Sequence, residues 1–162
     1  MSIKRFTVFN VFLFTLLSGY LFAQNYPDQL YVSRIDSIYQ NIETNVGMKL
    51  SSDGKSIMLQ DSVNDGYIIL KPQSSVSPFN EGLPSWNGSA SDADNGFRVQ
   101  MRFPYGGGWS PWLTVGYWKT NIYGAYSKPT YGGGFLDYYY VKSNSNQNSW
   151  QFKILMKRSS SL

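Results

Sequence analysis

The chain contains neither cysteine nor histidine. The lack of cysteine excludes disulfides, a thiolate nucleophile and cysteine metal sites. The lack of histidine removes the usual general base and the commonest zinc ligand, so no serine–histidine or cysteine–histidine catalytic site can be built. Proton chemistry would have to come from carboxylates, lysine or tyrosine.

Glutamate is scarce as well, because Glu43 and Glu81 are the only two. A glycosidase that acts through two carboxylates needs a positioned pair, and neither glutamate lies in a clearly predicted strand. Asp137 stands among tyrosines, but no second carboxylate is paired with it in the sequence. We therefore expect a protein that is not an enzyme. A carboxylate-dependent lyase that uses tyrosine is the catalytic alternative.

One acidic segment invites a metal-binding interpretation. Asp92 and Asp94 stand at alternate positions shortly before Gly96, as oxygen ligands of calcium do. An EF-hand loop, however, needs its glycine one place later and a glutamate at its twelfth position, which here is Phe103. A polar turn that leads into the next strand explains the segment better. We expect no metal and no cofactor.

The charge of the chain is low and dispersed. Lysine and arginine total 14 against 10 acids, a formal net charge of +4. Residues 1–23 carry Lys4 and Arg5, then an apolar run that ends at Ala23, which is the pattern of a secretory signal peptide. A retained anchor is the alternative. Removal of this segment, which has no acid, lowers the net charge to +2. We expect a secreted protein, extracellular or periplasmic, with no stable membrane anchor after cleavage and no nucleic-acid partner.

The remaining chain predicts a lead-in segment (24–45), one β-sandwich domain (46–158) and a short tail (159–162). Apolar residues of the lead-in recur at intervals of three and four, which fits a short helix, although its valine and isoleucine also suit a strand. The domain is long enough to bury a core of its own. Its short aromatic and β-branched runs, separated by turns, predict an all-β antiparallel sandwich or jelly roll of about eight strands.

Two runs alternate between apolar and polar residues, as half-buried strands do. In FRVQMRF (97–103), the predicted core face holds Phe97, Val99, Met101 and Phe103, and the wetter face holds Arg98, Gln100 and Arg102. In WQFKILMK (150–157), the predicted inward residues are Trp150, Phe152, Ile154 and Met156, and the outward ones are Gln151, Lys153 and Lys157.

Turn signals divide the rest of the domain. The Asp53-Gly54 pair between two apolar runs predicts a hairpin, and Asp65-Gly66 predicts the next turn. Residues 72–84, with three prolines, predict a loop or an irregular edge strand. FLDYYYVK (135–142) predicts one aromatic-rich strand. Residues 119–134 predict a long loop, and glycine, serine and asparagine loops are expected between the strands.

The segment GGGWSPWLTVGYW (106–118) holds three tryptophans after three glycines. Because tryptophan usually buries most of its area, we expect Trp112 and Trp118 to pack in the core. Trp109 precedes the strand and is expected on a loop surface beside Tyr105. Tyrosines of the long loop are expected to complete a rim of rings around a shallow ligand-binding groove, namely Tyr123, Tyr126 and Tyr131.

Four blocks in order carry a family resemblance: LPSWNG (83–88), FRVQMRF (97–103), WSPWLTVGYW (109–118) and WQFKILMKR (150–158). Together they resemble the β-sandwich module found N-terminal to C39-like cysteine-peptidase domains in secreted bacterial proteins. The match spans most of the chain after the lead-in. The resemblance implies the accessory module without its peptidase domain, since the cysteine and histidine of such a peptidase are absent. Such a module would stand free or belong to a longer protein.

These observations predict a secreted, non-catalytic binding or accessory module for extracellular polysaccharide or cell-wall glycan. The physical reason is the aromatic content of 17%, because flat rings stack on the apolar faces of sugars. The alternative is a structural domain that orients or shields a partner catalytic domain, with its aromatic residues serving the core and the interface.

Overall fold

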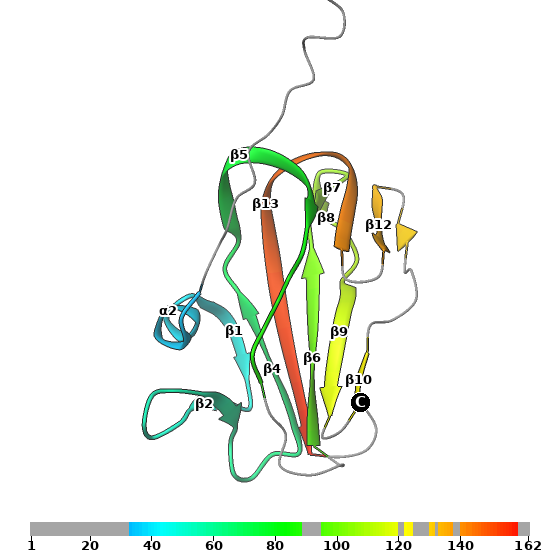
Figure 1. Cartoon of the computed structure of the whole chain (residues 1–162). Helices are drawn as coiled ribbons and strands as arrows, with labels where there is room; N and C mark the ends of the chain where they lie inside the picture. Colours follow the sequence, from blue (N-terminus) through cyan, green and yellow to red (C-terminus); the bar gives the residue numbers. More distant parts are fainter. Residues whose placement is uncertain are drawn as a thin grey trace, which may run out of the picture.

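The computed structural model describes residues 33–88, 95–119, 122–124, 130–131, 133–137 and 140–158. These residues form an all-β, sandwich-like fold with one short helix, as the sequence predicts (Figure 1). No helix among them is long and apolar enough to cross a bilayer. The helix is α2 (Ile35–Gln40), and the strands are β1 (Ile42–Val46), β2 (Met48–Leu50), β3 (Ile57–Leu59), β4 (Asp65–Leu70), β5 (Gln73–Gly82), β6 (Asn95–Arg102), β7 (Pro104–Tyr105), β8 (Gly108–Trp109), β9 (Leu113–Lys119), β10 (Ile122–Gly124), β11 (Thr130–Tyr131), β12 (Gly134–Asp137) and β13 (Tyr140–Arg158).

Six strands lie side by side in the main sheet, in the order β1-β4-β13-β6-β9-β10 (Figure 1). Every neighbouring pair in it is antiparallel. Strand β1 begins within the segment that the sequence assigns to a lead-in, yet it extends this sheet by pairing with β4. Helix α2 directly precedes β1, within the region where the sequence allows a helix.

Strand β13 links the main sheet to a smaller second layer. Its residues 151–158 pair with β6 and partly with β4, whereas residues 140–150 pair with β5 and β12. Both β5 and β13 arch over the top of the molecule in Figure 1, where their register shifts. At the bend, the Gln147 amide donates to the hydroxyl of Ser143 at 2.7 Å. The polar run 143–149 is therefore part of a strand, where the sequence predicts a loop.

The larger hydrophobic core lies between the two layers. Strand β6 alternates as predicted: Phe97, Val99 and Met101 are buried, and the residues between them are half-buried on the opposite face. Phe79 of β5 packs edge-on against Trp150, with ring centroids 5.5 Å apart. Burial of one such large apolar side chain contributes about 1.5–3 kcal/mol. The buried residues of this core are Met101, Phe103, Leu113, Val115, Leu136, Val141 and Trp150.

A second apolar cluster joins the main sheet to the β2–β3 hairpin. Met48 and Leu59 of the hairpin pack with Ile68 and Leu70 of β4. The predicted turn closes this hairpin, with Gly54 at a φ of +69°. Positive φ favours glycine, because a Cβ atom would clash with the backbone. Together with the second layer, this hairpin covers the core-facing side of the main sheet, which we call its inner face.

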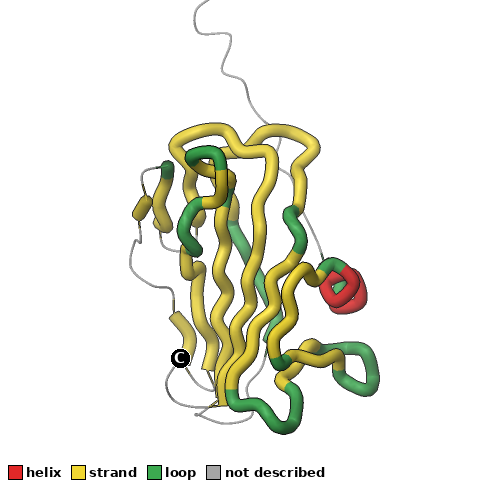
Figure 2. The backbone as a smooth tube through the Cα atoms, turned by 180° about the vertical axis from the view of Figure 1, so that it is seen from behind, coloured by secondary structure: helices red, strands yellow, loops and turns green. Residues whose placement is uncertain are grey.

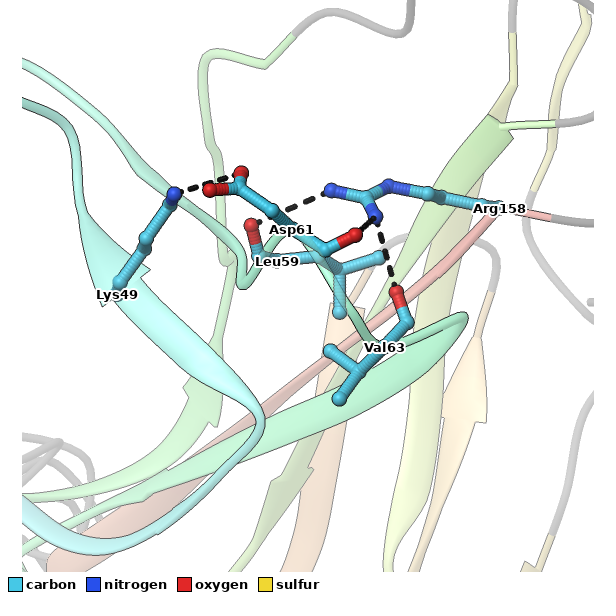
Figure 3. Close-up of polar contacts among 5 residues, drawn as sticks. All are labelled: Lys49, Leu59, Asp61, Val63 and Arg158. Atoms are coloured by element: carbon cyan, nitrogen blue, oxygen red, sulfur yellow. Dashed lines mark hydrogen bonds and ion pairs between the residues drawn. The ribbon is translucent and has the colours of Figure 1, made fainter.

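Polar contacts fasten the same hairpin to the end of β13 (Figure 3). The guanidinium of Arg158 donates to the carbonyl oxygens of Leu59, Asp61 and Val63 at 3.4, 3.0 and 3.1 Å. Lys49 pairs with the Asp61 carboxylate at 2.7 Å, and this hydrogen bond lowers the pKa of Asp61. Arg158 therefore has a structural role, because it holds the β2–β3 hairpin against the end of β13.

Two predicted connections are strands in the structure. Residues 73–82 form β5, which pairs with β13 alone among the described strands, so the alternative of an irregular edge strand is confirmed. The predicted long loop contains β10, paired with β9, and β11, paired with β12. In both segments the strand forms because a neighbouring strand pairs with it, and local residue propensity does not predict that pairing.

Two other predictions about strand ends are wrong. Residues 135–142 belong to two strands, because Asp137 of β12 pairs antiparallel with Tyr140 of β13. Asp65-Gly66 lies inside β4 and not in a turn. Gly66 is needed there for close approach to β1, since a Cβ atom at this position would lie 2.5 Å from the carbonyl oxygen of Val46.

Candidate functional site

The tryptophan-rich segment begins with the β7–β8 hairpin. Gly106 and Gly107 form its turn, with φ values of +60° and +81°. Positive φ at both central residues matches a type I′ turn, so these glycines are explained by backbone conformation. Ser110 fastens the base: its amide donates to the Phe103 carbonyl at 2.8 Å, and its hydroxyl accepts from the Phe103 amide at 3.1 Å.

Arg102 and two tryptophans meet on the outer face of the main sheet, which is the face opposite the core. Figure 2 is seen from this side, with the β7–β8 hairpin at its upper end. The guanidinium carbon of Arg102 lies 4.1 Å from the ring centroid of Trp112 and 5.0 Å from that of Trp109. Each cation–π contact stabilises by about 0.5–1 kcal/mol when exposed and by more when desolvated. Arg102 therefore ties the hairpin to the start of β9.

Gln151 lies beside Arg102 on the neighbouring strand and holds it in place. Its amide oxygen accepts hydrogen bonds from Nε of Arg102 at 2.8 Å and from Nη2. Its amide nitrogen donates to the Glu43 carboxylate and to the Leu70 carbonyl, the latter at 2.8 Å. Gln151 faces outward as predicted, yet it is only 1% exposed. The side chain is buried because every polar atom of its amide has a partner.

Arg102 stays charged in this network although its surroundings lower its pKa. Desolvation lowers the pKa of Arg102, and the nearby carboxylate of Glu43 raises it in part. A guanidinium keeps its proton under these conditions, because its ordinary pKa lies far above neutral pH. The outer face thus holds a permanent positive charge whose position is fixed by Gln151 and by the two indoles.

Lys153 extends this arrangement across the face. Its ammonium nitrogen lies 4.5 Å from the ring centroid of Tyr67 and 6.0 Å from that of Trp112. Opposite Lys153 on β6 stands Gln100, whose amide donates to the Thr114 hydroxyl at 3.0 Å. These side chains are all half-buried. The aromatic–cation cluster, as we name it, comprises Trp109, Arg102, Trp112, Lys153 and Tyr67.

The structure gives a mixed account of the predicted ligand-binding residues. Trp109 is half-buried and Tyr105 is 45% exposed. Because side chains alternate along a strand, the pairing of Trp109 with Pro104 places Tyr105 on the other side of the hairpin. The two residues belong to one hairpin, and their shared role in a rim of rings stays a prediction. Tyr123 and Tyr131 belong to β10 and β11, but their side chains, and Tyr126 as a whole, lie outside the described residues.

The prediction that Trp112 packs in the core is wrong. The ring is half-buried and contacts Arg102 on the outer face. Strand β9 begins only at Leu113, which is buried, so Trp112 precedes the strand and faces away from the core. The side chain of Trp118 lies outside the described part of the chain.

Sequence reasoning missed several members of the cluster, although signals for some existed. Alternation placed Arg102 and Lys153 on the wet side of their strands, and that orientation is confirmed. Nothing local indicated that Trp112 and Tyr67 would flank these cations. The register of β4, β13 and β6 brings the residues together, and it joins segments far apart in the sequence.

The cluster has the chemistry of a binding surface. Aromatic rings offer flat apolar area, two cations offer charge, and Gln100 and Thr114 offer groups for hydrogen bonds. Among the described residues, no three acidic side chains gather as they would around a metal ion. Comparison with known proteins finds no matching family model, no matching curated protein and no matching solved structure. The resemblance to the peptidase-associated module therefore remains a prediction from the sequence.

Proposed function

We propose that this protein is a secreted, non-catalytic module that binds extracellular polysaccharide or cell-wall glycan on the outer face of its main sheet. One observation carries the proposal: Trp109 and Trp112 are held against Arg102 on a sheet face, outside the hydrophobic core. Tryptophan outside a core, positioned by hydrogen-bonded neighbours, is suited to stack on the apolar face of a sugar ring.

Rigidity supports the same proposal. The β7–β8 turn is built from glycines in their favoured conformation, and Arg102 is oriented by Gln151. A preformed surface loses little conformational entropy when a ligand binds. A polymer with many repeated sugars could use a shallow surface of this kind, because each sugar contributes a small contact and the chain supplies many.

A second candidate is a structural domain that orients or shields a catalytic partner. Leu83 is 57% exposed and Tyr140 is 41% exposed. These residues directly follow and precede the Gly82–Val141 pair of the smaller layer, so the register brings two exposed apolar side chains to one end of that layer. An interface with another domain would cover them.

Binding to insoluble glycans tests the proposal. The wild-type protein is mixed with a panel of cell-wall and extracellular polysaccharides and sedimented, beside Trp109→Ala and a Leu83→Ser control. We expect wild type and Leu83→Ser to bind at least one polysaccharide, and Trp109→Ala to bind several-fold more weakly while remaining folded. Wild type that sediments with no glycan would contradict the proposal and favour the structural role.

A further inference from the structure

We infer that the polysaccharide bound by the outer face is acidic, and that Lys153 receives the carboxylate of a uronic acid unit. The inference rests on the proposed function, since it names the class of glycan for the same surface. It follows from the way in which the cations of the aromatic–cation cluster are held.

Lys153 differs from Lys49 and Lys142 in lacking a carboxylate partner among the described residues. Lys49 pairs with Asp61 at 2.7 Å and Lys142 with Glu81 at 3.3 Å. Lys153 forms no ion pair with any carboxylate of the described residues, and its ammonium lies instead near the rings of Tyr67 and Trp112. A half-buried cation among aromatic rings lacks part of its water shell, so an incoming anion gains more from it than from a fully solvated lysine.

Arg102 adds a second positive charge beside Trp112. Its hydrogen bonds within the described residues go to the neutral amide of Gln151. Glu43 interacts with this arginine through the same amide and does not form a direct ion pair with it among the described contacts. Two of the five guanidinium N–H groups are engaged in this way, and the others remain for a ligand or water.

The alternation of rings and cations indicates where the negative charge of the ligand should sit. The distances from cation to ring centroid range from 4.1 to 6.0 Å. A sugar stacked on Trp112 would therefore need its charge beside the stacked ring itself. A uronate meets this need, because its carboxyl group is bonded directly to the sugar ring. A phosphodiester polymer carries its charge on the linkage between units.

Polar groups next to Lys153 suit the remaining parts of such a sugar. Lys153 stands opposite Gln100, and the Gln100 amide nitrogen is bonded to Thr114. This bond uses the amide nitrogen of Gln100, so its amide oxygen is the group that would accept from a sugar hydroxyl. Carboxylate, ring face and hydroxyl would each find a complementary group within one patch.

The test compares a polymer with its own neutral form. Affinity of the wild-type protein is measured for polygalacturonate and for the same polymer after reduction of its carboxyl groups. We expect about tenfold tighter binding to the acidic form, the effect of one charge-assisted contact. In Lys153→Gln, the ratio of the affinities for the acidic and the reduced polymer should fall close to one. Lys153→Arg, which keeps the charge, should retain most of the wild-type ratio. Lys55→Gln, which removes the same charge from the β2–β3 turn, should keep the preference.

Each other result decides a separate question. Equal binding of wild type to both forms would overturn the inference while leaving the glycan-binding function in place. Absence of binding to either form, or to any other polysaccharide, would overturn both. A phosphodiester cell-wall polymer or a single-stranded oligonucleotide that binds more tightly than polygalacturonate, with loss in Lys153→Gln, would assign the site to another anion. Thermal melts of all variants should show folded protein, and a Lys153→Gln variant that is unfolded is replaced by Lys153→Met for the same comparison.

Discussion

The two faces of the main sheet use the same kinds of residue in opposite ways. On the inner face, Trp150 is 8% exposed and packs against Phe79 in an apolar core. On the outer face, Trp109 and Trp112 contact a cation and remain half-buried. The difference teaches that aromatic content alone does not separate core from binding surface. The two kinds of ring are told apart by what each ring contacts, which is apolar side chains in the core and a cation on the outer face.

A charge on the inner face should have the largest effect. Val99, 5% exposed, faces the core from the middle of β6. Val99→Asp would bury an unpaired carboxylate at a cost of several kcal/mol, a large share of the stability of a typical domain, so we expect an unfolded protein. Circular dichroism at 25 °C checks this, with Gln100→Asp on the outer face as a folded control. A Val99→Asp protein with the melting temperature of wild type would show that the register of β6 is wrong.

Truncation of one tryptophan on each face should sharpen the contrast. Trp150→Ala removes a ring from the core and should destabilise by about 3–5 kcal/mol. Trp109→Ala removes a cation–π contact and should cost about 1 kcal/mol. Chemical denaturation of both variants gives the two free energies of unfolding. Equal losses would mean that Trp109 belongs to the core after all.

The hydrogen-bond network under the outer face should give an intermediate effect. Gln151→Leu fills a similar volume but removes the acceptor of Arg102 and the donor to the Leu70 carbonyl. Loss of partners for buried polar groups should lower the free energy of unfolding by about 1–3 kcal/mol. Denaturant titration measures this loss, and tryptophan fluorescence should change because Arg102 shifts against its indoles. A variant as stable as wild type would contradict the structural role of this network.

The smallest effect on stability is expected from the Lys49–Asp61 ion pair at the β2–β3 hairpin. Lys49 lowers the pKa of the Asp61 carboxyl below its ordinary value of 3.8. A lowered carboxyl pKa stabilises the fold at pH values above 3.8, and this contribution is lost as the pH falls through the lowered pKa. The pair is on the surface, so Asp61→Asn should lower the melting temperature only slightly at pH 7. The difference from wild type should vanish in more acidic solution, and a difference that grows there would oppose this assignment.

Alternation along single strands allowed much of the fold to be predicted. The pattern of residues 97–103 correctly separates the buried Val99 from Arg98 and Gln100. Local signals failed where pairing overrides them, as in the polar run 143–149, which β5 and Gln147 keep within a bent strand. The candidate site could be predicted from the sequence even less well than the fold. Arg102 and Gln151 lie 49 positions apart in the sequence, and Gln151 and Glu43 lie 108 apart, so only the sheet register brings them together.

The position of the ligand is the central claim, and an NMR titration tests it most directly. Backbone amide and indole N–H signals of the wild-type protein are followed while a soluble galacturonate oligosaccharide is added. We expect saturable shifts for Trp109 and Trp112 on the outer face, and little change for Trp150 and Trp86, which pack against the core. Shifts confined to residues around Leu83 and Tyr140, or no shift at any concentration of this oligosaccharide or of a neutral one, would contradict the account.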